Sequence, residues 1–259
     1  MDPLVVLFGL GVGILVGTTG MGGGSLMTPL LILVFGVKPV MAIGTDLAYA
    51  AITKTFGAWR HHALRNVNHA LVRWLAIGSV PSSVLGVFTL DRLRDRLGDD
   101  VDVLVQDALG FALVLVGIAF VAKTCIRYRP VERELGGRLS LGQKLVAASI
   151  GLVFGFALGF TSVGSGTFFG MAMMLAFPLR PQRLVGTDVF HAAILVFAAA
   201  SAQTVAGNVQ FGTVGWILVG SLPGIFLGAQ FTGRAPERAL RLALGVTLAV
   251  AGIALLTSG

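Results

Sequence analysis

The chain alternates long apolar stretches with short polar segments. Several apolar stretches approach the roughly 20 residues that a helix needs to cross a bilayer. The first stretch is different, because glycines interrupt it after Thr19 and leave two arms, 4–16 and 26–35. Neither arm alone spans a hydrocarbon core of about 30 Å at the rise of an α-helix. The pattern therefore predicts a helical hairpin with a glycine-rich tip, followed by spans of full length.

The glycine-rich interruption occurs twice, at 18–25 and again at 160–167, an offset of 142 residues. Other matches at the same offset are Asp46 with Asp188, Trp74 with Trp216 and Pro81 with Pro223. Residues as unlike as aspartate, tryptophan and proline do not recur at one fixed offset through composition alone. The chain is therefore an internal duplication, and internal repeats are common in secondary transporters.

The distribution of Lys and Arg indicates how the two repeats are oriented. If each hairpin crosses the membrane once, the repeats are parallel and the basic residues divide nine against nine. If each hairpin enters and leaves by the same face, the repeats are inverted and fourteen basic residues lie on one side. The other side then keeps Lys38, Arg92, Arg94 and Arg96, with Lys54 in mid-membrane. Basic residues concentrate on the cytoplasmic side of membrane proteins, so the inverted arrangement is favoured.

We therefore expect an all-α integral membrane protein with two inverted-topology repeats. Each repeat comprises a re-entrant helical hairpin and three transmembrane helices. The first repeat covers residues 1–126 and the second covers 144–259, and together they form a single transmembrane domain. The linker 127–143 is the one long polar segment. The charge distribution places it in the cytoplasm, with both termini on the opposite side.

Composition supports a membrane protein and excludes several other classes. Charged residues make up 12% of the chain, against about 25% in soluble domains, and hydrophobic residues make up 55%. The net charge of +7 does not indicate nucleic acid as a partner, because no basic run is interleaved with aromatics. The single cysteine, Cys125, excludes intramolecular disulfides and Cys-rich metal sites. We expect no metal, no cofactor and no enzymatic activity.

Two inverted hairpins would bring their tips in from opposite faces, so we expect the tips to meet near the middle of the membrane. Irregular backbone at that depth is tolerated only where it is buried in protein or lines a wet cavity. Each second arm presents a helix N-terminus with free N–H groups, which favours an anion. The predicted substrate-binding residues at the tips are Thr19, Gly20, Gly22, Gly23, Gly24, Ser25, Thr161, Ser162, Gly164, Ser165, Gly166 and Thr167. The alternative is that these glycines only allow close helix packing.

Asp46 and Asp188 are predicted to lie about 10 Å into the membrane, because each comes seven residues after a proline suited to start a helix. Ionisable groups at that depth are costly and are functional candidates by default. With Thr45 and Thr187, we assign them to coupling or gating, as proton carriers or cation partners. The alternative, which the sequence favours equally, is that each Thr-Asp pair caps backbone N–H groups of the neighbouring hairpin.

Three further polar residues lie in the same two helices. Tyr49 and His191 are equivalent positions one turn deeper, and both are predicted to bind substrate; a buried histidine can titrate near neutral pH. Lys54 lies two turns after Asp46 and is included with the coupling or gating residues, since it could attract an anion. The favoured interpretation of Lys54 is nevertheless that its long side chain snorkels to the cytoplasmic interface.

The segment 22–25 after a short apolar run resembles the TauE/SafE family of sulfite exporters, also called TSUP. The segments 44–47 and 50–54, and the weaker second copy, add to a resemblance that covers essentially the whole chain. Many members of the family carry Ser where this chain has Asp46. The resemblance implies a multi-pass transporter of the bacterial cytoplasmic membrane that moves sulfite or an organosulfonate such as sulfoacetate.

The residues and the resemblance together predict a secondary transporter that exports a small sulfur-containing anion and is coupled to the proton gradient. The substrate would be held at mid-membrane between the two hairpin tips. A passive small-anion channel on the same scaffold is the alternative. The expected partners are the anion and the lipid bilayer, and a second copy of the chain in a homodimer is a further candidate.

Overall fold

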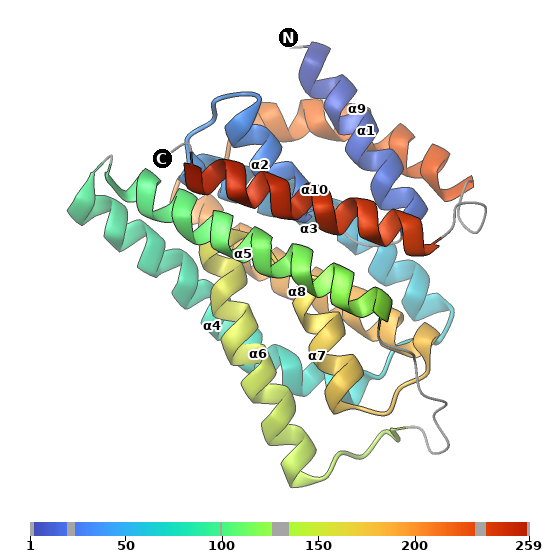
Figure 1. Cartoon of the computed structure of the whole chain (residues 1–259). Helices are drawn as coiled ribbons and strands as arrows, with labels where there is room; N and C mark the ends of the chain where they lie inside the picture. The colour runs from blue at the N-terminus through green and yellow to red at the C-terminus, as the bar shows by residue number, and fades with distance from the viewer. Residues whose placement is uncertain (1–2, 20–23, 99, 126–134, 231–236, 258–259) are drawn as a thin grey trace.

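The computed structural model describes residues 3–19, 24–98, 100–125, 135–230 and 237–257. These residues form ten helices and no strand (Figure 1). In chain order the helices are α1 (Pro3–Thr19), α2 (Gly24–Leu33), α3 (Pro39–Ala63), α4 (His69–Leu97), α5 (Asp100–Cys125), α6 (Leu141–Thr161), α7 (Phe168–Ala176), α8 (Pro181–Val205), α9 (Phe211–Gln230) and α10 (Glu237–Thr257). The predicted all-α class is confirmed for this part of the chain.

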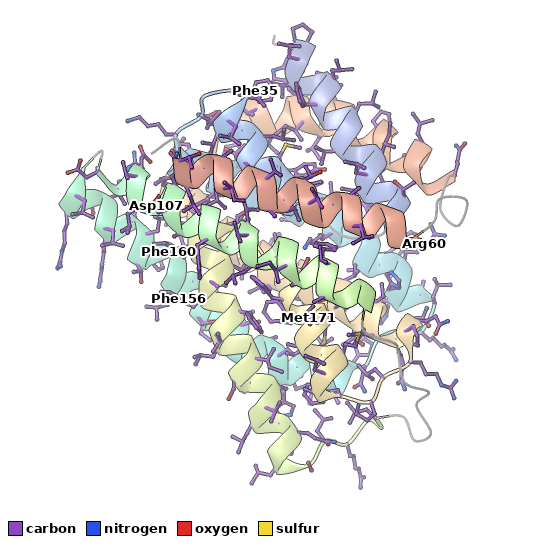
Figure 2. All side chains as sticks on the ribbon, in the orientation of Figure 1. Phe35, Arg60, Asp107, Phe156, Phe160 and Met171 are labelled. Atoms are coloured by element: carbon purple, nitrogen blue, oxygen red, sulfur yellow. The ribbon has the colours of Figure 1, made fainter. Side chains whose placement is uncertain are left out.

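Five of these helices are long and apolar enough to cross a membrane, namely α4, α5, α6, α8 and α9. Helix α3 is as long as α8, at 25 residues, but Asp46, Lys54 and a basic last turn reduce its apolar character. Large apolar side chains also cover the outside of the bundle. Phe156, labelled in Figure 2, is 37% exposed on α6 and stacks on Phe160 with ring centroids 6.3 Å apart. The chain is a multi-pass helical membrane protein.

The helices pack in pairs that repeat the 142-residue offset. Helix α1 packs against α9, and α6, the counterpart of α1, packs against α4. A Cβ atom at Gly9 would lie 2.7 Å from the carbonyl oxygen of Ile217. One at Gly151, the equivalent residue, would lie 2.3 Å from the carbonyl oxygen of Leu75. Glycine therefore permits the same close backbone approach twice, once in each pair.

Equivalent helices of the two repeats run antiparallel where they meet. The start of α3 lies at the end of α8, because Gly44 packs on the backbone of Asn208. The start of α8 lies at the end of α3, because Gly186 packs on the backbone of Asn66. Helices α5 and α10 also pack against each other in opposite directions (Figure 1). The central helices α3 and α8 thus carry equivalent residues in opposite order along one axis.

Helices α6 and α7 form a hairpin around the break at 162–167. In Figure 1, α7 returns from the break toward the edge at which α6 begins. The outer ends are joined, because the N–H of Leu135, ahead of α6, donates to the carbonyl of Pro178, after α7, at 2.9 Å. Helix α7 has only nine residues, a length of about 14 Å. The break therefore lies inside the bundle and not at its surface.

Helices α3 and α8 begin at Pro39 and Pro181, as the sequence predicts. Proline suits the first helical turn, because its φ is already helical and its missing N–H has no intrahelical partner there. Both helices are buried along much of their length, including Asp46 and Asp188. This position brings the two carboxylates into the centre of the molecule.

Candidate functional site

The break between α6 and α7 is a stretch of irregular backbone whose conformation depends on glycine. Ser162 ends α6 in the left-handed region at φ 63°, and Gly164 and Gly166 follow with φ 103° and 136°. The carbonyl of Gly164 accepts from the N–H groups of Gly166 and Phe168 at 2.9 and 3.2 Å. Positive φ angles of this size are reached without strain only by glycine. The predicted glycine-rich interruption is therefore present in the second repeat as a tight turn between two helices.

Asp46 connects α3 to this break. Its Oδ2 atom accepts a hydrogen bond of 2.6 Å from the hydroxyl of Thr28 in α2 and another from the hydroxyl of Ser162. The two hydroxyl oxygens are 2.9 Å apart. Asp46 is completely buried, and its Oδ1 atom has no hydrogen-bond partner among the described residues. Three oxygens from α3, α2 and the end of α6 thus form one compact cluster.

Lys54 reaches the same break from two turns further along α3. Its Nζ atom donates to the carbonyl of Ser165 at 2.6 Å and also to the Ser165 hydroxyl. The side chain is 6% exposed, so the interpretation that it snorkels to the interface is wrong. The ammonium group has three N–H donors, and the described residues accept from two of them. A positive charge is therefore held at the second hairpin tip.

Asp188 lies on the opposite central helix, beside the same tip. Its Oδ2 atom is 3.9 Å from the place that a Cβ atom at Gly166 would occupy. Lys54 interacts electrostatically with both Asp188 and Asp46. The two carboxylates are therefore the counter-ions of the buried ammonium group. One cation and two carboxylates surround the break.

Thr45 and Thr187 bind the backbone of the opposite repeat. Thr187 Oγ1 accepts from the N–H of Asn68, at the start of α4, at 3.0 Å. Thr45 Oγ1 accepts from the N–H of Gln210, the equivalent of Asn68, at 3.1 Å. The alternative that each Thr-Asp pair caps backbone N–H groups of a hairpin is therefore correct only in part. The threonines do bind backbone N–H groups, but these groups lie next to α4 and α9 and not in a hairpin. Asp46 instead binds side-chain hydroxyls.

Tyr49 and His191 are both completely buried. His191 Nε2 lies 2.8 Å from the hydroxyl of Ser79, and the imidazole packs on Phe169 with ring centroids 4.7 Å apart. The hydroxyl of Tyr49 lies near that of Ser221, the equivalent of Ser79, but the two hydroxyls do not have hydrogen-bond geometry. His191 Nδ1 also has no hydrogen-bond partner in the described structure. The two equivalent positions therefore carry different polar groups at the same depth.

A sequence model of the family described as Sulfite exporter TauE/SafE matches residues 5–255. The chain belongs to the TauE/SafE family. It is 38% identical to the probable membrane transporter protein YjnA of Bacillus subtilis, over 99% of this chain and 100% of the relative. It is 27% identical to YdhB of the same organism, over 98% and 99% of the two chains, and 24% identical to MJ0441 of Methanocaldococcus jannaschii, over 98% and 95%. No solved structure matches the chain significantly.

Much of the first tip of this TauE/SafE protein falls outside the described residues. Gly20, Gly22 and Gly23 are not among them, and neither are the side chains of Thr19 and Ser25. Gly24 begins α2. The expectation that the two tips face each other therefore stays a prediction.

At the second tip, two of the four predicted hydroxyl groups bind other helices. Ser162 binds Asp46, and Ser165 binds Lys54. Thr161 instead donates to the carbonyl of Ala157 in its own helix at 2.7 Å. Thr167 is buried and makes no capping hydrogen bond at the start of α7. The polar surface of this tip is thus centred on Ser162 and Ser165.

Sequence reasoning missed Thr28 and Ser79, which bind Asp46 and His191. Thr28 had a detectable signal, since it is the one polar residue in the apolar arm 26–35. A hydroxyl inside such an arm needs a partner, because an unpaired polar group is costly in an apolar environment. Ser79 has a counterpart in the second repeat but no comparable contrast with its neighbours in sequence.

Proposed function

We propose that this chain is a secondary transporter of a small sulfur-containing anion, either sulfite or an organosulfonate such as sulfoacetate, and that Lys54 with the second tip forms its anion site. The observation that carries the proposal is the buried ammonium group of Lys54 against the irregular backbone at Ser165. A buried charge is costly without a counter-charge, and a substrate anion provides one when Asp188 is protonated. The Lys54 N–H that lacks an acceptor among the described residues is available to that anion.

Asp188 provides the link to the proton gradient in this proposal. The substrate anion and the ionised Asp188 carboxylate compete for the same ammonium group, since Asp188 lies beside the same break and interacts electrostatically with Lys54. Protonation of Asp188 removes the competitor and favours anion binding. Acid on the side from which the anion leaves therefore accelerates its transport. In this scheme proton and anion move in the same direction, so a gradient that is acid outside drives the anion inward. The outward direction is proposed from the description of the family as sulfite exporters, and the anion's own concentration gradient then drives the outward flux.

The proposal includes two inverted-topology repeats, 1–126 and 144–259, each with a re-entrant hairpin and three transmembrane helices. Inversion is supported by the antiparallel course of α3 and α8 and by contacts made twice at the 142-residue offset. A hairpin that leaves by the face it entered is supported by the bond between Leu135 and Pro178. In the bacterial cytoplasmic membrane, the linker 127–143 would lie inside and both termini outside.

Flux measurements in proteoliposomes test this function. Sulfite, thiosulfate, sulfoacetate, methanesulfonate and a carboxylate control are compared, each with and without a pH gradient. We expect saturable flux of the sulfur anions and little flux of the carboxylate. Methanesulfonate is the matched probe for the pH response, because sulfite itself takes up a proton near neutral pH. Equal flux for all anions would contradict a selective site.

The pH response separates the transporter from a passive channel. Acidifying the compartment from which methanesulfonate leaves is expected to raise its flux in the wild-type protein. The Asp188→Asn variant is expected to lose this response, since its side chain is neutral at every pH. A channel would conduct without saturation and would respond to pH equally in the wild type and the variant.

A further inference from the structure

Three oxygen atoms converge between the two repeats, from Asp46, Thr28 and Ser162. Thr28 Oγ1 lies 2.6 Å from Asp46 Oδ2 and 2.9 Å from Ser162 Oγ. Each of the three residues is at most 2% exposed. Carboxylate and hydroxyl oxygens are the ligands that hard cations prefer. Asp46 Oδ1 adds an acceptor that no group in the described structure uses.

The end of α6 adds a negative field to this oxygen cluster. Ser162 is the C-cap of α6, and its N–H donates to the carbonyl of Leu158. The carbonyls after Leu158 in the last turn have no intrahelical donor. A helix C-terminus carries partial negative charge, which disfavours a neighbouring carboxylate and favours a cation. The hydrogen bonds of the Lys54 ammonium group go to Ser165, and the hydroxyls bound to Asp46 belong to Thr28 and Ser162.

Ser162 keeps a hydroxyl where the backbone favours glycine. Its φ of 63° is in the left-handed region, which costs a non-glycine residue about 1–2 kcal/mol. The equivalent residue in the first repeat is Gly20, which has no such cost. Strained residues of this kind cluster at functional sites. The hydroxyl oxygen beside Asp46 is what serine adds at this position.

The oxygen cluster occurs only once in the duplicated sequence. Asp188 is the counterpart of Asp46, but the counterparts of Thr28 and Ser162 are Gly170 and Gly20. Neither glycine has a side-chain oxygen. The residues equivalent to Thr28 and Ser162 therefore cannot build the same oxygen cluster around Asp188.

We infer that Asp46, Thr28 and Ser162 form a binding site for a monovalent cation, Na⁺, separate from the anion site at Lys54. A single carboxylate balances a single positive charge, and the short separations between the oxygens suit a small ion. Broken helices that offer C-terminal carbonyls to Na⁺ are a recurrent construction in secondary transporters. The inference rests on the proposed function, because the ion would move across the membrane together with the anion.

Equilibrium binding of radioactive ²²Na⁺ to the purified full-length protein at fixed pH tests the site directly. We expect saturable binding that unlabelled Na⁺ displaces and K⁺ does not. Thr28→Val and Ser162→Ala should each weaken binding by about 10- to 100-fold, and Asp46→Asn should abolish it. Thr55→Val is the matched control, because the Thr55 hydroxyl binds the carbonyl of Ala51 in its own helix. Thermal unfolding verifies that each variant is folded.

Two results would overturn the cation site. One is the absence of saturable Na⁺ binding to the wild-type protein, and the other is equal binding by Thr28→Val and Thr55→Val. Sulfite flux at equal pH on both sides, with and without Na⁺, separates this inference from the proposed function. Sulfite flux without Na⁺ binding would reject the cation site and leave the proposed function intact. Na⁺ binding without flux of any sulfur anion would reject the proposed function and leave the cation site intact.

Discussion

Asp46 and Asp188 are equivalent in sequence, but their surroundings differ. Asp46 binds the hydroxyls of Thr28 and Ser162, whereas the equivalent residues for Asp188, Gly170 and Gly20, have no hydroxyl. The surroundings of the threonines that precede the two carboxylates do not differ. Each threonine accepts a hydrogen bond from a backbone N–H of the opposite repeat. The duplication has therefore preserved these contacts between the repeats, while the residues that bind Asp46 have been replaced at the equivalent positions of the other repeat.

The divergence is concentrated on α3. Asp46 and Lys54 both project from α3 onto the break of the second repeat. The counterpart of Lys54 in α8 is Val196, an apolar residue that is completely buried. The position equivalent to Lys54 in α8 thus carries no cation. The charge of Lys54 therefore lies on one side of a scaffold whose packing is repeated, an asymmetry that suits the single anion site proposed above.

Removing the charge of Lys54 is expected to have the largest effect. Lys54→Met keeps most of the length of the side chain but removes the positive charge beside two buried carboxylates, with an expected loss of about 3–5 kcal/mol in the free energy of unfolding. Anion flux in proteoliposomes should also disappear. Thermal unfolding in detergent and flux assays measure the two effects.

Two double variants of Lys54→Met sharpen the comparison of the carboxylates. Adding Asp188→Asn should recover most of the lost stability, because it removes the charge that Lys54 neutralised. Adding Asp46→Asn should recover less, since Asp46 retains the hydroxyls of Thr28 and Ser162. Neither double variant should recover flux. Equal recovery of stability by the two would show that the carboxylates share Lys54 equally.

The sequence predicted the parts of this site that depend on local patterns. The offset of 142 residues located Asp46 and Asp188 as an equivalent pair, and Pro39 placed Asp46 deep within α3. The prediction for Lys54 is wrong because the position of a residue along α3 does not determine whether its side chain reaches the membrane interface. Its partner, Ser165, is 111 residues away in sequence, and the contact depends on how α3 packs against a hairpin of the other repeat. Helical periodicity does not contain that information.

Replacing Ser162 tests whether the second break can be made to resemble the first. Ser162→Gly removes the hydrogen bond to Asp46, worth about 1.5–3 kcal/mol for a charged acceptor, but relieves the left-handed strain of about 1–2 kcal/mol. Ser162→Ala loses the bond and keeps the strain. Ser162→Ala is therefore expected to be less stable than Ser162→Gly by about 1 kcal/mol in thermal unfolding. Equal stability would mean that the backbone angle at Ser162 is not a source of strain.

Thr45→Val and Thr187→Val test the part of the structure that the duplication preserved. Each variant removes an acceptor for a backbone N–H, so each should lower stability by about 1 kcal/mol. Hydrogen exchange should accelerate at Gln210 in the first variant and at Asn68 in the second. A difference in stability of more than about 1 kcal/mol between the two variants would show that the two threonine contacts are not equivalent.

Tyr49→Phe is expected to have the smallest effect on stability, because the Tyr49 hydroxyl makes no hydrogen bond in the described structure. His191→Phe should lose about 1 kcal/mol, since it removes the bond to Ser79. A hydroxyl without an internal partner is available to substrate, so Tyr49→Phe should raise the KM for methanesulfonate about fivefold, the equivalent of one hydrogen bond of about 1 kcal/mol. An unchanged KM would make Tyr49 a packing residue. The functional difference between the two repeats would then be limited to the residues around the break and would not include Tyr49 and His191.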